Sequence, residues 1–245
     1  MKRLSKVTAA LLLLPPLAGA GTAQATSLQI APTFISVTAP NATSTLALRN
    51  AGDRPLAAQV RVFTWKQVGG ESVLEPASGV VVSPPLMTIP AKGEFVVRVV
   101  RTTKQPLVQE ESYRLIVDEI PDASAKADGR VNFALRYSVP VFFSPQNSGA
   151  PELQWSLEGS GASRSLVARN SGMQHVRLSA LQLETQGVRR LMVRDGLAGY
   201  VLPGSTFRLP LPSSAGAILA GQNVRILAQT EAGAISGVLH GQSGR

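Results

Sequence analysis

One long alternating segment dominates the hydrophobic pattern of the chain. Between positions 131 and 143 every odd residue is apolar: Val131, Phe133, Leu135, Tyr137, Val139, Val141 and Phe143. Strict alternation predicts a β-strand with one apolar face, and at about 3.3 Å per residue it would extend roughly 43 Å. Pro140 cannot donate a ladder hydrogen bond, which favours an edge strand. Because an apolar edge recruits other chains, either a neighbouring segment covers it or recruitment is its function.

Shorter alternating runs recur along the rest of the chain. They lie between Gly, Pro, Asn and Ser clusters at a spacing of about ten residues, which is typical of β-sandwiches. The strands expected in the first half are 27–30, 44–49, 57–65, 80–83, 94–100 and 113–119. Together with 131–143 they suffice for one immunoglobulin-like sandwich.

A weak internal repeat predicts a second sandwich. The sequence LALRNAG at 46–52 is echoed by LVARNSG at 166–172. In both places Arg-Asn-x-Gly is expected to close a strand with a turn, since Asn and Gly tolerate positive φ. The turn-rich link 146–151 places the boundary between two domains, 26–147 and 148–245. The predicted fold is therefore all-β, with two immunoglobulin-like domains.

The N-terminus has the pattern of a cleaved export signal. Lys2, Arg3 and Lys6 precede an apolar stretch, and small residues follow up to Ala25. We expect residues 1–25 to be a signal peptide cleaved near Ala25, too short and too interrupted by proline for a membrane anchor. Removing three cations lowers the formal charge from +9 to +6. With export expected and no basic run, nucleic acid is not an expected partner.

No constellation in the sequence indicates catalysis or metal binding. The two histidines, His175 and His240, are 65 residues apart without acidic or histidine neighbours at ligand spacing. Ser243 lies in a tail without the strand-turn-helix context of a nucleophile elbow. The chain has no cysteine, so it must fold on its cores alone. We expect no enzyme activity, no metal and no cofactor.

Arg114 is the most informative polar residue. If the segment 110–121 forms a hairpin with 131–143, centred near Lys126, Arg114 lies roughly opposite Ser138 and Pro140. A guanidinium there could anchor a carboxylate through two parallel hydrogen bonds. The alternative is an ordinary solvated arginine on a strand, and the sequence alone does not decide between them.

At these residues the chain resembles the PapD-like family, the periplasmic chaperones of the chaperone-usher pathway of pilus assembly. The matching stretches follow the family's order through most of the first domain: 46–50, 60–65, 81–85, 89–93, 97–101, 111–121 and 136–145. The second half matches more loosely, at Asn170, 200–204 and 230–233. The sequence around 64–67 and 111–114 is closer to the archaic or alternative branch of the pathway.

The resemblance implies a mechanism for the opening strand. It implies two domains set as a boomerang, in the periplasm, with pilin subunits and an outer-membrane usher as partners. The last strand of the first domain would complete a subunit that lacks its final strand. Val131, Phe133, Leu135 and Tyr137 are then the expected donor residues, filling the subunit's apolar groove.

Three departures from the family pattern change the expected site. Phe34 and Pro140 stand where the better-known branch has an Arg and a Lys that bind the subunit's terminal carboxylate. We therefore expect Arg114 to take over as the carboxylate anchor. The family's interdomain salt bridge maps onto Glu111 and Glu231, but its Arg falls on Ser144, which leaves the partners of both acids open.

Two other functions compete with the chaperone. One is an exported immunoglobulin-like module that pairs by strand addition through the same edge, as a homodimer or with another surface protein. The other is an exported β-sandwich hydrolase, which the missing catalytic constellation disfavours.

Overall fold

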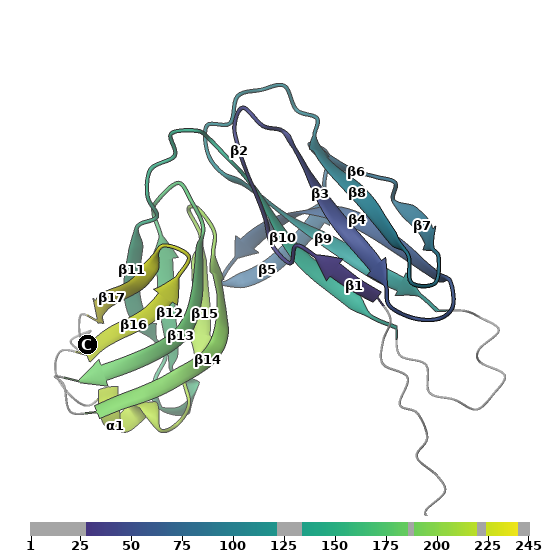
Figure 1. Cartoon of the computed structure of the whole chain (residues 1–245). Coiled ribbons are helices and arrows are strands. Elements are labelled where there is room, and N and C mark those ends of the chain that lie inside the picture. The colour runs from purple at the N-terminus through teal and green to yellow at the C-terminus, as the bar shows by residue number, and fades with distance from the viewer. Residues whose placement is uncertain (1–27, 122–133, 186–188, 220–223, 240–245) are drawn as a thin grey trace, which may run out of the picture.

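The computed structural model describes residues 28–121, 134–185, 189–219 and 224–239, and these confirm the predicted all-β fold. Apart from a single 3₁₀ turn (Gly161–Ser163) and the five-residue helix α1 (Ala215–Leu219), the regular structure described is strand. Two β-sandwiches meet at an angle and give the chain a boomerang shape (Figure 1). No helix within the described ranges has the length and apolar character needed to cross a membrane. The expected signal segment lies outside the described residues.

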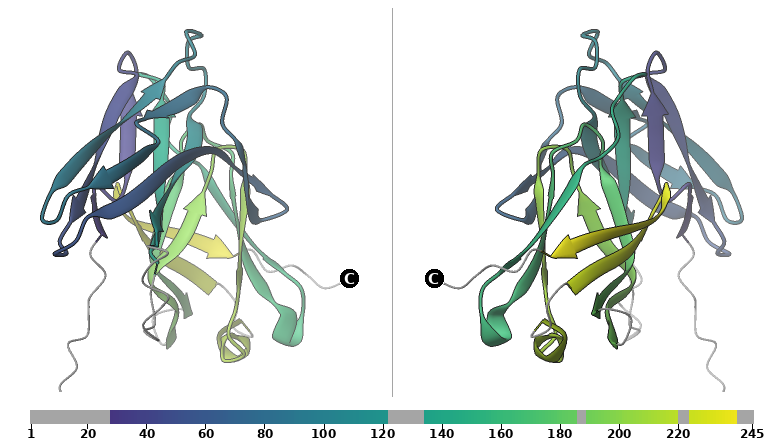
Figure 2. Two further views of the ribbon diagram at one scale, coloured as in Figure 1. Left: turned by 90° about the vertical axis from the view of Figure 1, so that its right-hand side faces the viewer. Right: turned by 90° about the vertical axis from the view of Figure 1, so that its left-hand side faces the viewer.

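The first sandwich contains two sheets. One has the strand order β1 (Leu28–Ala31), β3 (Thr43–Asn50), β8 (Glu94–Arg101) and β6 (Val80–Ser83). The other has the order β2 (Ile35–Thr38), β10 (Arg136–Ser144), β9 (Glu111–Ile120), β4 (Leu56–Val68) and β5 (Glu71–Pro76), with β7 (Leu86–Ile89) also pairing β4. The β4–β5 hairpin continues past the sandwich toward the second domain (Figures 1 and 2).

The second sandwich is smaller. Its first sheet has the order β11 (Leu153–Glu158), β12 (Ser165–Asn170) and β15 (Thr206–Pro210). Its second sheet has the order β14 (Arg189–Val201), β13 (Val176–Thr185), β16 (Val224–Thr230) and β17 (Gly233–Leu239). The predicted boundary after Asn147 falls between β10 and β11 and stays a prediction.

Each sandwich has its own core, built by the alternation that predicted the strands. In the first, Leu46 and Leu48 of β3 are fully buried and pack in one cluster with Val139 and Val141 of β10. In the second, a separate cluster includes Leu178, Leu183 and Ile226. Burying one such side chain contributes roughly 1.5 to 3 kcal/mol, so the domains need no disulfide for their cohesion.

The two Arg-Asn-x-Gly repeats close strands as predicted, but none of their Asn and Gly residues has the positive φ that was expected. The amide of Asn50 donates to the carbonyl oxygens of Arg54, Ile89 and Pro90 at 2.7, 3.2 and 3.1 Å, and its Oδ1 accepts from the Gly52 N–H at 2.9 Å. Asn170 repeats the arrangement with Gln174, Val201 and Gly172. Both side chains are fully buried. Each asparagine thus satisfies backbone groups where a strand ends inside the protein.

The expected strands of the first half correspond to β1, β3, β4, β6, β8 and β9, and no end differs by more than three residues. The long segment 131–143 is observed as β10 from Arg136 to Ser144, and Val131 and Phe133 lie outside the described residues. The short strands β2, β5 and β7 were not predicted. Each of these three strands pairs with a strand that was predicted.

Replacing the buried Asn50 should test the importance of these turns. Asn50→Ala removes a donor shared by buried carbonyl groups and should lower the free energy of unfolding by about 2–4 kcal/mol. Asn41→Ala, at an exposed turn, is the matched control and should change it by less than about 0.5 kcal/mol. Urea unfolding followed by circular dichroism measures both, and equal losses would contradict the assigned role.

Candidate functional site: the free edge of β10 and the joint between the domains

The N-terminal half of β10 has a neighbour on one side only. β9 pairs antiparallel with β10 from Arg136 to Phe143, whereas β2 pairs in parallel only with Val141 to Ser144. From Arg136 to Pro140 the opposite side of β10 therefore faces no strand within the described residues. Such an edge is a template for another chain.

The register shows which backbone groups face this edge. The Glu119 N–H donates to the Leu135 carbonyl at 2.9 Å, so odd-numbered residues of β10 exchange their backbone bonds with β9. The N–H and C=O groups of Arg136 and Ser138 consequently point to the free edge. Pro140 belongs to the same set, and its missing N–H costs no bond within the sheet. The prediction of an edge proline holds for this half of the strand.

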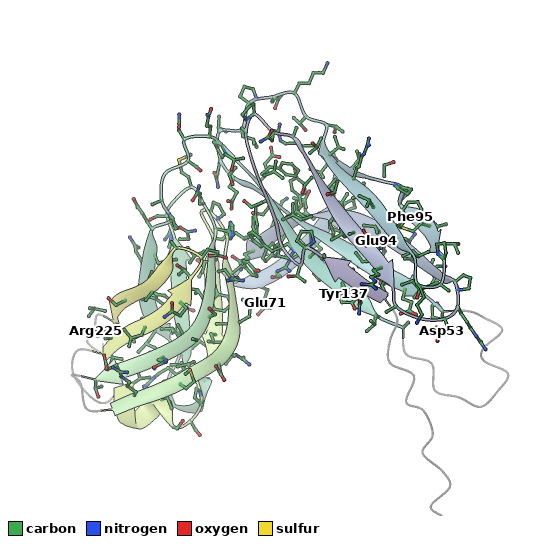
Figure 3. The ribbon with its side chains drawn as sticks, viewed as in Figure 1. Asp53, Glu71, Glu94, Phe95, Tyr137 and Arg225 are labelled. Carbon is green, nitrogen blue, oxygen red and sulfur yellow. The ribbon has the colours of Figure 1, made fainter. Side chains whose placement is uncertain are left out.

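The side chains of β10 divide between two faces. Val139, Val141 and Phe143 are buried in the core of the first domain. Tyr137 is half-buried against that core, beside β1 (Figure 3), and its hydroxyl donates to the Leu28 carbonyl at 2.6 Å. Leu135 is half-buried. Of the two expected donor residues that the structure describes, Tyr137 is thus held by its own domain, and Leu135 precedes it at the N-terminal end of the edge.

Arg114 lies next to the free edge, as predicted. It is paired directly with Pro140, and its Nη1 lies 3.5 Å from the Ser138 carbonyl oxygen. The guanidinium carbon is 3.7 Å from the ring centre of Trp65 and 5.4 Å from that of Tyr200. The two rings come from different domains and meet edge to face at 5.3 Å. Arg114 is therefore oriented by aromatic faces.

The charge of Arg114 has no carboxylate partner within the described residues. Other arginines of the chain, such as Arg61, Arg101 and Arg208, do pair with an acid. Burial lowers the pKa of Arg114 below its ordinary value, which shows that its surroundings disfavour the uncompensated charge. A half-buried guanidinium of this kind gains from an incoming carboxylate, which can accept two parallel hydrogen bonds.

An aromatic cluster joins the two domains beside Arg114. Trp65 and Phe142 of the first domain pack with Tyr200 and Leu202 of the second, and Phe34 covers the cluster. Phe34, which stands where the better-known branch of the family has an arginine, therefore packs on Phe142, with 5.6 Å between the ring centres. Burial raises the pKa of the Tyr200 hydroxyl, with Arg114 opposing that rise. The joint is apolar where the two sheets meet.

Polar contacts from the β4–β5 hairpin also connect the two domains. Gln67 donates to the Tyr200 carbonyl at 2.7 Å and accepts from the Leu202 N–H at 2.9 Å. At the tip of the β4–β5 hairpin, Arg208 donates to the Gly69 carbonyl. The contacts of Gln67 hold the end of β14, and with it Tyr200, against β4, and the contact of Arg208 holds β15 against the hairpin turn.

The expected interdomain acids each pair within their own domain. Glu111 accepts from Arg101 at 2.8 and 2.9 Å and from the Tyr113 hydroxyl at 3.0 Å. Glu231 pairs with Arg177 at 3.1 Å. Neither makes an ion pair between the domains in the described part of the chain.

Glu110, the residue before Glu111, makes the interdomain contact instead. Its side chain is 2% exposed, and Oε1 accepts from the His175 backbone N–H at 2.9 Å and lies 2.9 Å from His175 Nδ1. Oε2 accepts from the Ser144 hydroxyl at 3.0 Å. The sequence offered little to find this pair, because neighbouring strand residues point to opposite faces and His175 has no acidic neighbour along the chain.

The described residues contain no group of three or more side chains suited to hold a metal ion. An open groove of about 430 Å³ lies over the joint, lined by residues 64–68, 109–113 and 202, 203 and 205. The arrangement suits the binding of an extended chain. It combines the free edge of β10 with the Arg114 guanidinium, which has no acidic partner in the described residues, and the interdomain aromatic cluster lies beside both.

Comparison with known proteins gives a consistent result. Residues 27–149 match the family model for the pili and flagellar-assembly chaperone, PapD N-terminal domain. Among solved structures, the chain is similar to the CsuC-CsuE chaperone-tip adhesion subunit pre-assembly complex from archaic chaperone-usher Csu pili of Acinetobacter baumannii, with 27% identity, a TM-score of 0.69, and 87% of this chain and 98% of that chain covered. No curated protein sequence matches the chain.

Two further solved structures share the fold. The chaperone DraB of E. coli is 21% identical, with a TM-score of 0.56 and coverage of 87% of this chain and 95% of that one. The Pseudomonas aeruginosa CupB2 chaperone is 19% identical, with a TM-score of 0.59 and coverage of 86% and 100%. Both extend across the two domains.

The pair of Arg101 and Glu111 predicts an acid-sensitive contribution to stability. The hydrogen bonds from Arg101 hold the pKa of Glu111 below its ordinary value of 4.5, against the opposing effect of burial. The unfolded chain therefore binds a proton here more readily than the folded chain, so this stabilisation is present above about pH 4.5 and is lost as the pH falls further.

Glu111→Gln should lower the free energy of unfolding by about 1.5–3 kcal/mol at pH 7 and make the loss between pH 5 and pH 3 shallower than in wild type. Urea unfolding at several pH values measures it. The exposed pair of Glu75 and Lys66 supplies the control, since Glu75→Gln should change stability by less than about 1 kcal/mol. An unchanged acid profile in Glu111→Gln would refute the assignment.

Proposed function

This chain belongs to the family of pili and flagellar-assembly chaperones, and on that premise we propose that it binds a client strand along the free edge of β10 and the client's terminal carboxylate at Arg114. It binds and stabilises pilus subunits by donor-strand complementation, and the family implies delivery to an outer-membrane usher. Chaperones of this pathway are periplasmic. We infer that residues 1–25 direct export and are removed near Ala25.

One observation carries the binding proposal. The unpaired half of β10 ends at Pro140, which is paired with Arg114 of β9, and this half-buried guanidinium has no counter-ion in the described residues. The backbone groups of Arg136 and Ser138 offer a client strand both donors and acceptors, each bond contributing about 0.5–1.5 kcal/mol net. The edge supplies affinity without reading the client's sequence.

The carboxylate fixes the register of the added strand. The Trp65 ring covers one face of the Arg114 guanidinium, with 3.7 Å between the guanidinium carbon and the ring centre. The N–H groups at the edge of the guanidinium can then donate two parallel bonds to a carboxylate. A client strand held there by its terminus runs along β10 from Ser138 toward Leu135. Because a shift of one residue would turn every client side chain to the other face, a fixed end selects one pairing.

The donor side chains then enter the client's groove. We propose Val131, Phe133 and Leu135 for this role, each contributing roughly 1.5–3 kcal/mol on burial before association costs. Tyr137 differs from these three residues, since its ring packs on the core of its own domain and its backbone groups bond to β9. No step requires catalysis, a metal or a cofactor, and we infer that the protein has no enzymatic activity.

Co-expression with a pilin subunit of the same secretion system tests the anchor. Arg114→Ala should leave the chaperone folded and reduce the soluble subunit recovered with it at least about tenfold, because the client carboxylate loses its charged partner. Arg225→Ala, an exposed arginine on β16, is the matched control and should have no effect. Equal subunit yields from both variants would exclude Arg114 as the anchor.

The donor side chains are tested in the same assay. Leu135→Glu or Phe133→Glu places a charge in the apolar groove of the client and should abolish subunit recovery. Val96→Glu, on an exposed position of β8, controls for the added charge. If both donor variants matched wild type while Val96→Glu lost the subunit, the donor-strand account would be wrong. The competing homodimer predicts a different result: a dimer of the purified chain in light scattering that Leu135→Glu disrupts.

A further inference from the structure

We propose that Arg61 and Arg136 form a second charged contact for the client, which selects an acidic side chain at the fourth position before the client's terminal residue. The proposal deepens the proposed function and rests on it for the direction and register of the client strand. Both arginines belong to the sheet that contains β4, β9 and β10, on its outer face, where Trp65 meets Tyr200 of the second domain.

The alternation of side chains places three charged groups together on this outer face. Val60 of β4 and Val139 of β10 are buried in the core of the first domain. Arg61 and Arg136 lie an odd number of residues from these valines, so their side chains point the other way. Asp118 of β9 is paired directly with Arg136 and shares its face.

The outer face carries an excess of positive charge. Its charged side chains, on the described strands of this sheet, are Arg61, Arg114, Arg136 and Asp118, so three positive charges stand against one negative charge and leave +2. A terminal carboxylate at Arg114 would balance one of the two excess charges. The other stays with Arg61 and Arg136, which share the single carboxylate of Asp118.

Asp118 lies between the two arginines without using up their donors. Arg61 Nη2 donates to Asp118 Oδ2 at 2.6 Å, and Arg136 Nε donates to Oδ1. Burial would raise the pKa of Asp118, but the hydrogen bonds from Arg136 and Arg61 hold it below its ordinary value, so the carboxylate is charged. The side chains of Arg61 and Arg136 are still 43% and 67% exposed. Since a guanidinium has five N–H donors, each can bind a further acceptor.

β2 sets the place where a client strand along β10 must end. β2 pairs in parallel with β10 from Val141 onward, so a client strand on the same side has room only as far as Pro140. Arg114 is paired with Pro140, which puts the client's terminal residue level with both. The client strand then runs parallel to β10, and its fourth residue before the terminal one is level with Arg136.

The level of Arg136 also decides which client side chains can reach it. Residues level with each other on neighbouring strands point to the same face, and the strands lie about 4.8 Å apart. The client's fourth residue before the end therefore faces Arg136, whereas the third and fifth point to the opposite face. The Phe63 ring centre lies 5.6 Å from the Arg61 guanidinium, and Ile116, paired with Arg61, is 7% exposed. These apolar neighbours limit the screening of the charges by water.

Competition between variants of one subunit measures the preference. A pilin subunit of the same secretion system would carry Glu, Gln or Lys at the fourth position before its terminal residue. The three forms are unfolded, mixed in equal amounts and diluted into a limiting amount of the full chaperone. Mass spectrometry of the purified complex gives the total subunit bound and the ratio of the three forms. The same residues placed at the third position form the control series.

Wild type should bind the Glu form about three- to tenfold more than the Gln form, and the Lys form least, as expected for a partly exposed charge pair at an interface. Arg136→Glu should reverse this order. Asp118→Asn releases both arginines from their internal acid and should increase the preference for Glu, whereas a purely structural role would lower total binding and leave the ratio unchanged. Arg98→Glu, at an exposed position of β8, should match wild type. At the third position, Glu should gain nothing over Gln.

Equal binding of the Glu and Gln forms by wild type would overturn the second contact, as would an undiminished preference in Arg136→Glu or an equal preference at the third position. If circular dichroism shows that Arg136→Glu does not fold, Arg61→Gln and Arg136→Gln decide the question, since each should lower the preference by removing one charge.

The total amount of subunit bound separates this proposal from the previous one. Total binding that depends on Arg114, without a preference for Glu, leaves the carboxylate anchor standing and removes the second contact. If Arg114→Ala binds as much subunit as wild type, the anchor is wrong, and the ratio of the Glu and Gln forms still decides the contact at Arg136.

Discussion

The structure depends on a constraint of backbone chemistry: a strand whose N–H and C=O groups have no partner must find one. β2 satisfies β10 only from Val141 onward, so the preceding half of the strand remains unpaired in the described structure. Within that half, Pro140 removes a donor from the edge, which limits indiscriminate pairing. The anchor proposed at Arg114 would favour a strand that also offers a carboxylate.

The second domain contributes to the site mainly through the joint. Arg114, Trp65 and the free edge all belong to the first domain, and only Tyr200 comes from the second. Burying Glu110 between the domains means that moving them apart would strand a carboxylate in an apolar setting. The same packing that orders the two sandwiches therefore determines how far Arg114 is shielded from water.

Much of the first domain followed from the sequence, and the reasons are local. The alternation of apolar and polar residues is a local signal in the sequence. Strands such as β3 and β8, and the pairing of Arg114 with Pro140, could therefore be predicted. β2 and β7 have only four residues each and are strands because a neighbour pairs with them, which no local pattern records. The choice between Glu110 and Glu111 depended on which face each presents to the second domain. His175 gained its partner across 65 residues, beyond the reach of any spacing argument.

The contacts around the joint also define how the two arms can move. Gln67 and Gly69, one near the end of β4 and the other at the adjoining turn, attach the β4–β5 hairpin to the second domain. Glu110, the residue before β9, makes a further contact to His175 of that domain. Between these polar contacts lies the aromatic cluster, in which Trp65 meets Tyr200 at 5.3 Å. Because Tyr200 also faces Arg114 at 5.4 Å, any movement that parts the two rings would expose the guanidinium to water as well.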